Sequence, residues 1–238
     1  PELSASMGEN KFDIAYSLRA STYRGQKQLT LQFEEFRVVE ETPVELKPKK
    51  LEIIDYRLHV GKLESLKVET LVWAEGSEKS KGKSRYDLHQ ADEFAIYTTP
   101  PSPAELRKAL EIVKPKTIYV FAVLPVEEIT DDFLNRLTGL CKYALNQRGG
   151  KVTVHELAAT MASREGAIEI GLQWLAAGGH LSVDVKDNEV NLSAEKPEAN
   201  QYLQKEMYIA LRGLLTETSA YRKYFATVDL KALFQNET

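Results

Sequence analysis

The sequence predicts a mixed α/β protein, α+β overall, and three observations carry this prediction. Apolar and polar residues alternate in two runs near the amino terminus, which is typical of a β-hairpin. Further along, two apolar runs flank an amphipathic stretch at 94–123, which is the pattern of a strand, a helix and a parallel strand. From residue 130 onward, apolar residues recur at helical spacing.

The predicted hairpin consists of residues 12–18 and 29–33, joined across 20–27 with Gly25 in the connection. An isolated hairpin is only marginally stable in water, so these strands need partner strands. The residues at 1–10 are mostly polar, and the chain does not begin with Met. We therefore expect residues 1–42 to be the last strands of a domain that begins in a longer protein.

A linker and a small α/β domain are predicted next. Residues 43–50 contain two prolines and several charges, which indicates an exposed linker. The domain at 51–126 is predicted to hold strands, a mobile basic loop and one helix, in the order strand 51–60, strand 70–74, loop 77–85, strand 94–98, helix 104–113 and strand 117–123. Ser102 is placed to cap the helix, with Pro103 at its first position and Glu105 at capping-box spacing. Short connectors make 94–123 a βαβ unit in a mainly parallel sheet.

Residues 127–238 are predicted to form a winged-helix domain with C-terminal helices. The expected elements are a helix at 131–148 ended by Gly149 and Gly150, a strand at 151–153, helices at 154–161 and 163–177, a two-stranded wing at 180–192, and one or two helices at 197–234. Ser163 is expected to cap the third helix.

Composition limits the class of protein. With 238 residues, 43% hydrophobic and 28% charged, the chain is long enough for two globular domains. No apolar run approaches the ~18 residues that a membrane span needs, and a single cysteine excludes an internal disulfide framework. We expect a cytoplasmic protein without membrane contact. The net charge of −4 argues against nucleic-acid binding by the whole surface, so any DNA contact must be local.

The amino-terminal run also resembles a known family. Residues 12–19 (Phe-Asp-Ile-Ala-Tyr-Ser-Leu-Arg), 23–25 (Tyr-Arg-Gly) and 29–32 (Leu-Thr-Leu-Gln) resemble the last strands of the OB-fold in the RecJ family of single-strand-specific 5′→3′ DNA exonucleases. Residues 94–106 and 118–121 resemble the C-terminal region that some bacterial members carry after that fold. The resemblance implies a parent hydrolase of DNA repair and recombination that acts on single-stranded DNA and uses Mn²⁺ or Mg²⁺.

The resemblance does not include the part of the family that performs chemistry. The family carries an Asp-His-His motif before its OB-fold, where two divalent metals activate water. This sequence has no Asp-His-His, and its histidines, at 59, 89, 155 and 180, are far apart. Asp87 and His89 are only a near match, in a polar loop. We therefore expect this fragment to be inactive alone and to hold no cofactor or metal.

The first candidate DNA-binding cluster lies near the hairpin turn and contains Arg19, Tyr23, Arg24 and Lys27. OB-folds bind single strands by combining a basic groove with aromatic stacking platforms. Arg24 and Lys27 would then neutralise phosphates while Tyr23 stacks on a base. The alternative is an ordinary solvated loop held by a tyrosine.

The second candidate is the densest positive run of the chain, Lys79, Lys81, Lys83 and Arg85. Such a run can follow a phosphate backbone. The glycine, the serines and Glu78 around it equally fit a plain solvated loop.

The predicted third helix and wing are acidic. Arg164 is set against Glu165 and Glu169, and the wing sets Lys186 against the carboxylates Asp184, Asp187 and Glu189. Since phosphate contacts supply most of the non-specific affinity for DNA, this charge favours docking of a replication or repair protein. A stand-alone winged-helix DNA-binding regulator is the alternative.

Other features have structural interpretations. A self-contained α/β enzyme would need convergent polar groups beside the 98–103 connector, whose prolines remove backbone N–H donors. Gly178-Gly179-His180 is expected to be a helix end leading into the wing. Cys141 and both tryptophans are expected in the core.

Overall fold

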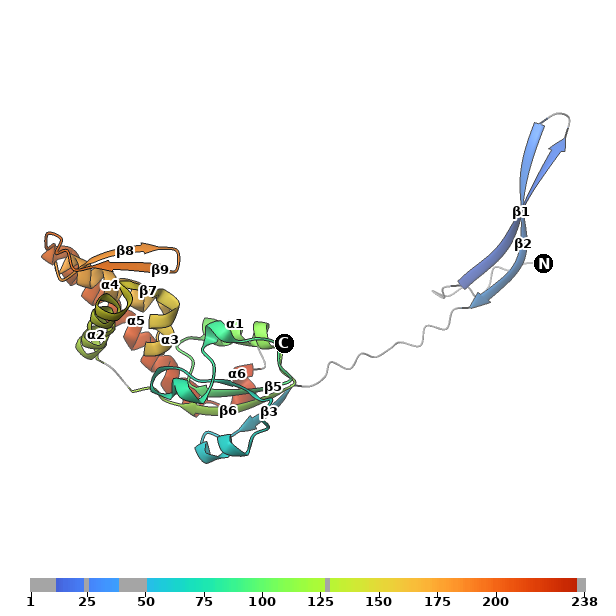
Figure 1. The fold of residues 1–238 in the computed structure, drawn as a ribbon. Coiled ribbons are helices and arrows are strands. Elements are labelled where there is room, and N and C mark those ends of the chain that lie inside the picture. The colour runs from blue at the N-terminus through green and yellow to red at the C-terminus, as the bar shows by residue number, and fades with distance from the viewer. Residues whose placement is uncertain (1–11, 24–25, 39–50, 127–128, 235–238) are drawn as a thin grey trace. The chain divides into compact units, whose positions relative to one another are not determined.

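The computed structural model describes residues 12–23, 26–38, 51–126 and 129–234 (Figure 1). The chain divides into two compact units, Pro1–Pro48 and Lys49–Thr238. The first unit contains a β-hairpin, and the second contains a parallel sheet and a helix-rich part.

The hairpin pairs β1 (Phe12–Tyr23) with β2 (Gln26–Val38) in antiparallel register. The strands are longer than the alternation predicted, because pairing continues to Tyr23 opposite Gln26. Between Ala15 and Tyr16 the register steps from Glu35 to Phe33, which is a β-bulge. The predicted hairpin is therefore confirmed, with a tighter connection than expected.

The parallel sheet has the strand order β3-β6-β5-β4. Its strands are β3 (Glu52–Asp55), β4 (Leu71–Trp73), β5 (Glu93–Thr98) and β6 (Thr117–Val123). All three strand pairs are parallel, and α1 (Pro103–Val113) connects β5 to β6. The predicted βαβ unit is confirmed.

Helix α1 begins where its sequence predicts. The Ser102 side chain accepts a hydrogen bond from the Glu105 backbone N–H at 3.2 Å, and Pro103 occupies the first turn. This cap satisfies one of the N–H groups that a helix start leaves without a partner.

Alternate strand residues supply the two faces of the sheet. One face packs against α1 and the C-terminal helices, as in Figure 1, through a core that includes Phe94, Ile96, Ile118, Val120 and Leu106. The other face packs against 56–66, a segment with the 3₁₀ helix η1 (Val60–Ser65), through a core that includes Ala95, Tyr97, Phe121, Tyr56 and Leu63.

The expected irregular loop at 77–85 is instead folded, so that prediction was wrong. Residues Gly76–Lys81 form the 3₁₀ helix η2, and Arg85–Asp87 form η3. Between them, the Lys83 N–H donates to the Val72 carbonyl at 2.8 Å, which brings the chain back beside β4. Gly82 permits this approach, because a Cβ there would lie 2.3 Å from the Val72 carbonyl oxygen.

The helix-rich part contains the predicted elements in the predicted order. They are α2 (Thr130–Arg148), β7 (Lys151–Thr153), α3 (Val154–Met161), α4 (Glu165–Ala177), β8 (Ser182–Lys186), β9 (Glu189–Ser193), α5 (Gln201–Thr227) and α6 (Leu230–Phe234). The three strands form an antiparallel sheet of order β7-β9-β8. The core of this part includes Phe133, Leu137, Leu157, Ile168 and Leu172.

Two helix ends test local signals. Helix α2 ends at Gly149 and Gly150, as predicted, and these residues have φ of 61° and 80°. The prediction that Ser163 caps α4 was wrong, because α4 starts later, its N-cap is Arg164 and no side chain caps it. The Ser163 N–H instead donates to the Ala158 carbonyl at 2.9 Å and closes the end of α3.

Helix α5 belongs to both hydrophobic cores. Its Leu211 lies in the core of the helix-rich part, whereas its Phe225 lies in the core of the parallel sheet, with Leu230 and Phe234 of α6. The C-terminal helices, expected within domain 127–238, therefore also complete the domain expected at 51–126.

Candidate functional site

The two faces of the hairpin differ in chemistry. The register places Tyr16 opposite Phe33 and Leu18 opposite Leu31, so apolar side chains gather on one face. All described members are more than half exposed, namely Ile14, Tyr16, Leu18, Leu29, Leu31 and Phe33. The other face is polar, with Arg19 opposite Thr30.

Of the candidate cluster at the hairpin turn, the structure describes Arg19 fully, and this residue is exposed. The backbones of Tyr23 and Lys27 pair with Gln26 and Thr22. Arg24 and the side chains of Tyr23 and Lys27 lie outside the described residues. The contact of this cluster with DNA stays a prediction.

The fold places the residues of the basic run at 79–85 in different environments. Lys79 and Lys83 are exposed. The exposed Lys81 ammonium donates to the Tyr97 hydroxyl at 2.6 Å and lies 2.9 Å from Glu78. The hydrogen bond from Lys81 to Tyr97, and then that to Glu78, raises the pKa of Lys81 above its ordinary value.

Arg85 does not join the basic surface, contrary to the expectation of a solvated side chain. It is 5% exposed and pairs with Glu75, which is 2% exposed. Glu75 Oε1 accepts from Arg85 Nε at 2.9 Å and from the Trp73 indole at 3.0 Å. The guanidinium is thus held inside the fold, away from any phosphate backbone.

Helix α4, the expected reading helix, is engaged within the protein. Its apolar residues contribute to the core shared by α2 and α5. The Arg164 guanidinium donates to the Pro101 carbonyl at 3.2 Å and to Glu217 at 3.1 Å. Glu165 accepts from the Tyr86 hydroxyl at 2.8 Å.

Asp87 and His89, the near match to the Asp-His-His motif, contact residues close to them in the chain. Asp87 accepts from the Ser84 hydroxyl at 2.6 Å, and His89 Nδ1 lies 3.4 Å from the Asp87 carbonyl oxygen. Within the described ranges, no group of three or more His, Cys, Asp or Glu residues is arranged to hold a metal ion.

The remaining sequence features are structural. Gly178 and Gly179 end α4, as expected. Cys141 is fully buried in the core of the helix-rich part, as expected, and this burial raises the pKa of its thiol to about 12. Among the helices that the structure describes, none combines the length and apolar character needed to cross a membrane.

The connector at 98–103 offers its hydroxyls to the fold itself. Thr98 Oγ1 accepts from the Glu75 N–H at 2.7 Å, and the Thr99 hydroxyl donates to the Val123 carbonyl at 3.1 Å. These groups do not converge on a substrate site as the α/β-enzyme alternative requires.

Sequence reasoning missed a contact between the sheet part and the helix-rich part. The rings of Tyr86 and His155 stack with centroids 3.9 Å apart, and His155 Nε2 lies 3.6 Å from Glu165 Oε1. No periodicity or spacing links these residues, because they are far apart in the chain.

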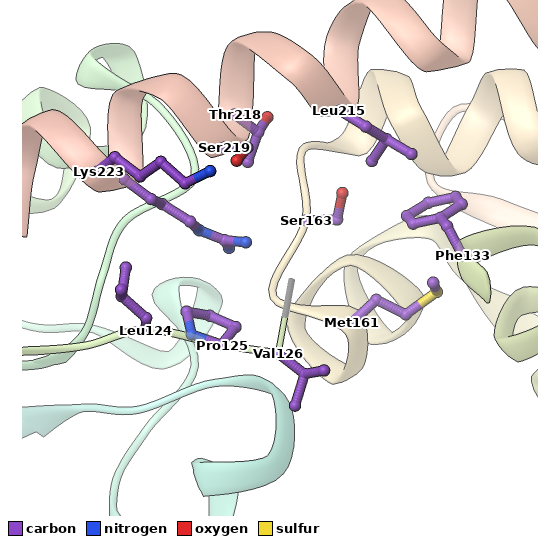
Figure 2. Close-up of a pocket in the computed structure, with 11 residues that line it drawn as sticks. Leu124, Pro125, Val126, Phe133, Met161, Ser163, Leu215, Thr218, Ser219 and Lys223 are labelled. Carbon is purple, nitrogen blue, oxygen red and sulfur yellow. The ribbon is translucent and has the colours of Figure 1, made fainter. Parts of the chain in front are cut away.

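Sequence reasoning also missed a small cavity lined by both apolar and polar side chains, which Figure 2 shows. The cavity lies where the connection after β6 meets the α3–α4 turn and α5. It is lined by Leu124, Pro125, Val126, Phe133, Met161, Ser163, Leu215, Thr218, Ser219, Arg222 and Lys223.

No protein-family model matches this chain, and neither a curated protein nor a solved structure matches it.

Proposed function

We propose that this chain is the non-catalytic accessory region of a RecJ-type single-stranded-DNA-specific 5′→3′ exonuclease of DNA repair and recombination. In this proposal β1 and β2 complete an OB-fold, and the Lys49–Thr238 unit positions the nuclease on DNA or docks a partner protein. The observation that carries the proposal is the hairpin with one apolar face and one polar face.

The apolar face supports the OB-fold assignment. Fully burying a side chain such as Leu or Phe is worth about 1.5–3 kcal/mol, so leaving the face in water forgoes a large stabilisation. A two-stranded hairpin also needs further strands to be stable. An OB-fold supplies both, because it closes five strands over an apolar interior.

The polar face and the turn would then lie toward the nucleic acid. Arg19 is exposed on this face, and the turn carries Arg24 and Lys27 in sequence. A basic groove with an aromatic platform is how OB-folds bind single strands. The parent enzyme would supply the Mn²⁺ or Mg²⁺ site.

The second unit favours protein docking. The order of α2, β7, α3, α4 and the β8–β9 pair fits a winged helix. Its α4 packs in the core, and Arg164 is paired with Glu217. A helix held in this way is poorly placed to read duplex DNA, which counts against a stand-alone regulator and in favour of a replication or repair protein as partner.

Fluorescence anisotropy with a labelled ~20-nucleotide single strand, at low and moderate salt, tests the DNA contact. We expect salt-sensitive binding whose slope falls by about 1.4 when Arg24 and Lys27 are both changed to Ala, since each phosphate contact on a single strand contributes about 0.7. The matched control changes Lys142 and Lys205, both exposed lysines elsewhere, to Ala. Absence of binding at low salt would remove DNA contact from the proposal and leave protein docking.

A further inference from the structure

Strand β8 forms an open edge of the three-stranded sheet in the helix-rich part. The strand order is β7-β9-β8, so β8 pairs with β9 on one side and with no described strand on the other. Figure 1 shows β8 on the outer side of β9. The second half of β8, from Asp184 through Val185 to Lys186, is exposed. The opposite edge strand, β7, has only three residues and continues directly into α3.

The backbone groups of β8 that point away from β9 follow from the register. Along an antiparallel pair, residues alternate between those that bond the neighbouring strand and those that point away from it. The Leu192 N–H on β9 donates to the carbonyl of Gly150, directly before β7, at 2.8 Å. The adjacent position of β9, which pairs with Asp184, therefore bonds β8. The backbone N–H and C=O groups of Val183 and Val185 then point outward from the sheet.

Two charges of opposite sign lie on this edge. Asp184 and Lys186 are two residues apart, so they share the face of β8 opposite to Val183, which packs against the core of the helix-rich part. Among the residues that the structure describes, neither charge has an ion pair or a side-chain hydrogen bond, although Glu189 is the β9 partner of Lys186. Charged residues commonly prevent an edge from pairing. An acid and a base at this spacing instead permit pairing in one register.

That register follows from charge. If a second β8 strand pairs antiparallel and centred on Asp184, two carboxylates lie opposite each other, which is destabilising. If the pair is centred on Val183, it uses the half-buried part of β8 and leaves Lys186 beyond the partner strand. If it is centred on Val185, each Asp184 lies opposite Lys186 of the other copy, at a non-hydrogen-bonded position where side chains are closest. The two Val185 residues then exchange backbone hydrogen bonds and cover each other's side chains, which are 39% exposed in one copy.

We propose that β8 pairs with β8 of a second copy of this chain, antiparallel and centred on Val185, so that the two sheets become one continuous sheet. Two Asp184–Lys186 ion pairs and the pair of Val185 residues hold the contact. No residue of the hairpin takes part, so the contact does not depend on the function proposed above. Such a short edge buries less than the roughly 1,200 Å² of a standard interface, so the dimer is weak and concentration-dependent.

Sedimentation equilibrium of the full chain at low salt, over roughly 10 μM to 1 mM protein, tests the self-association. We expect a dimer that dissociates as salt rises. Asp184→Lys alone and Lys186→Asp alone should each weaken dimerisation about tenfold or more, because both attractive pairs become repulsive. An equimolar mixture of these two variants should dimerise as the unchanged protein does, since every pair in the mixed dimer is again opposite in charge. The control Lys142→Asp, at an exposed position of α2, should leave dimerisation unchanged.

Amide hydrogen exchange identifies the strand that pairs. A higher protein concentration should slow exchange severalfold at the outward Val185 N–H and leave the Asp184 N–H, which already bonds β9, unchanged. Association through the apolar hairpin would be unaffected by the two charge reversals. The proposal would be overturned by a chain that stays monomeric at ~1 mM, by a dimer that neither reversal weakens, or by a mixture that does not restore the dimer.

Discussion

The buried ion pair of Glu75 and Arg85 is the clearest case of a single residue whose role the sequence misassigned. Arg85 lies at the end of a basic run, yet its guanidinium is enclosed with Glu75 beside Trp73. Both charges have left water, so each depends on nearby opposite charge, and Arg85 has a second carboxylate, that of Glu105, at 3.5 Å.

Breaking this pair should destabilise the protein strongly. We expect Glu75→Gln to lower the free energy of unfolding by about 3–5 kcal/mol, because the buried Arg85 charge then keeps only the longer contact with Glu105, at 3.5 Å. The double change to Glu75→Met and Arg85→Met should cost less than the single change, because it buries no charge. Urea unfolding followed by circular dichroism measures both, and a single change that costs less than the double one would contradict this account.

Gly150 offers a second test at this scale. Its φ is +80°, and a Cβ there would lie 2.1 Å from the Leu192 carbonyl oxygen. Gly150→Ala should therefore destabilise by more than the ~1 kcal/mol typical of a left-handed glycine site. Gly139, inside α2 with open space around it, is the control. There, alanine should stabilise by about 0.5–1 kcal/mol in the same urea measurement.

At the scale of elements, the hairpin exposes apolar side chains that its own unit does not cover. Its apolar residues pair across β1 and β2 but remain more than half exposed. A contiguous exposed apolar face commonly marks an interaction surface.

We expect this face to bind an apolar dye. Changing Leu18 and Leu31 together to Ser should reduce the fluorescence of bound anilinonaphthalene sulfonate and leave the melting temperature of the Lys49–Thr238 unit unchanged, because that unit is compact by itself. Ser17→Thr with Gln32→Asn, on the polar face, is the control and should not change the fluorescence. Unchanged dye binding in the Leu18 and Leu31 variant would mean that this face is covered in solution.

At the scale of the whole molecule, α5 joins two cores that the sequence pattern separates at 126/127. Leu211 and Phe225 are both fully buried on this helix but belong to different cores. The Arg57 guanidinium adds a second link, because it donates to the carbonyls of Phe225 at 3.2 Å and Val228 at 2.8 Å.

The Lys49–Thr238 unit should therefore unfold as one cooperative unit. Trp73 lies in the sheet part and Trp174 in the helix-rich part, so Trp73→Phe and Trp174→Phe variants each leave one fluorescent reporter. We expect both reporters to give the same urea midpoint, and Phe225→Ala to lower both midpoints together through a loss of about 3–5 kcal/mol. Two separate midpoints would mean that α5 does not couple the cores.

Several elements could be predicted from local sequence signals. Alternation predicted β1 and β2, Ser102 and Pro103 predicted the start of α1, and Gly149 predicted the end of α2. Each of these elements depends on residues a few positions apart, so the residues that make the sequence pattern are the same residues that interact in the structure.

Which polar groups are buried, and which residues they contact, depends on the packing of the fold. This packing enclosed Arg85 with Glu75, moved Ser163 from a helix cap to a cavity wall, and placed Phe225 under the parallel sheet. These contacts join residues whose spacing follows no helical or strand period, and burial depends on all the elements that pack around a side chain. From the sequence, a charged side chain or a hydroxyl is therefore expected at the surface. The packed fold shows whether it is buried and which residues it contacts.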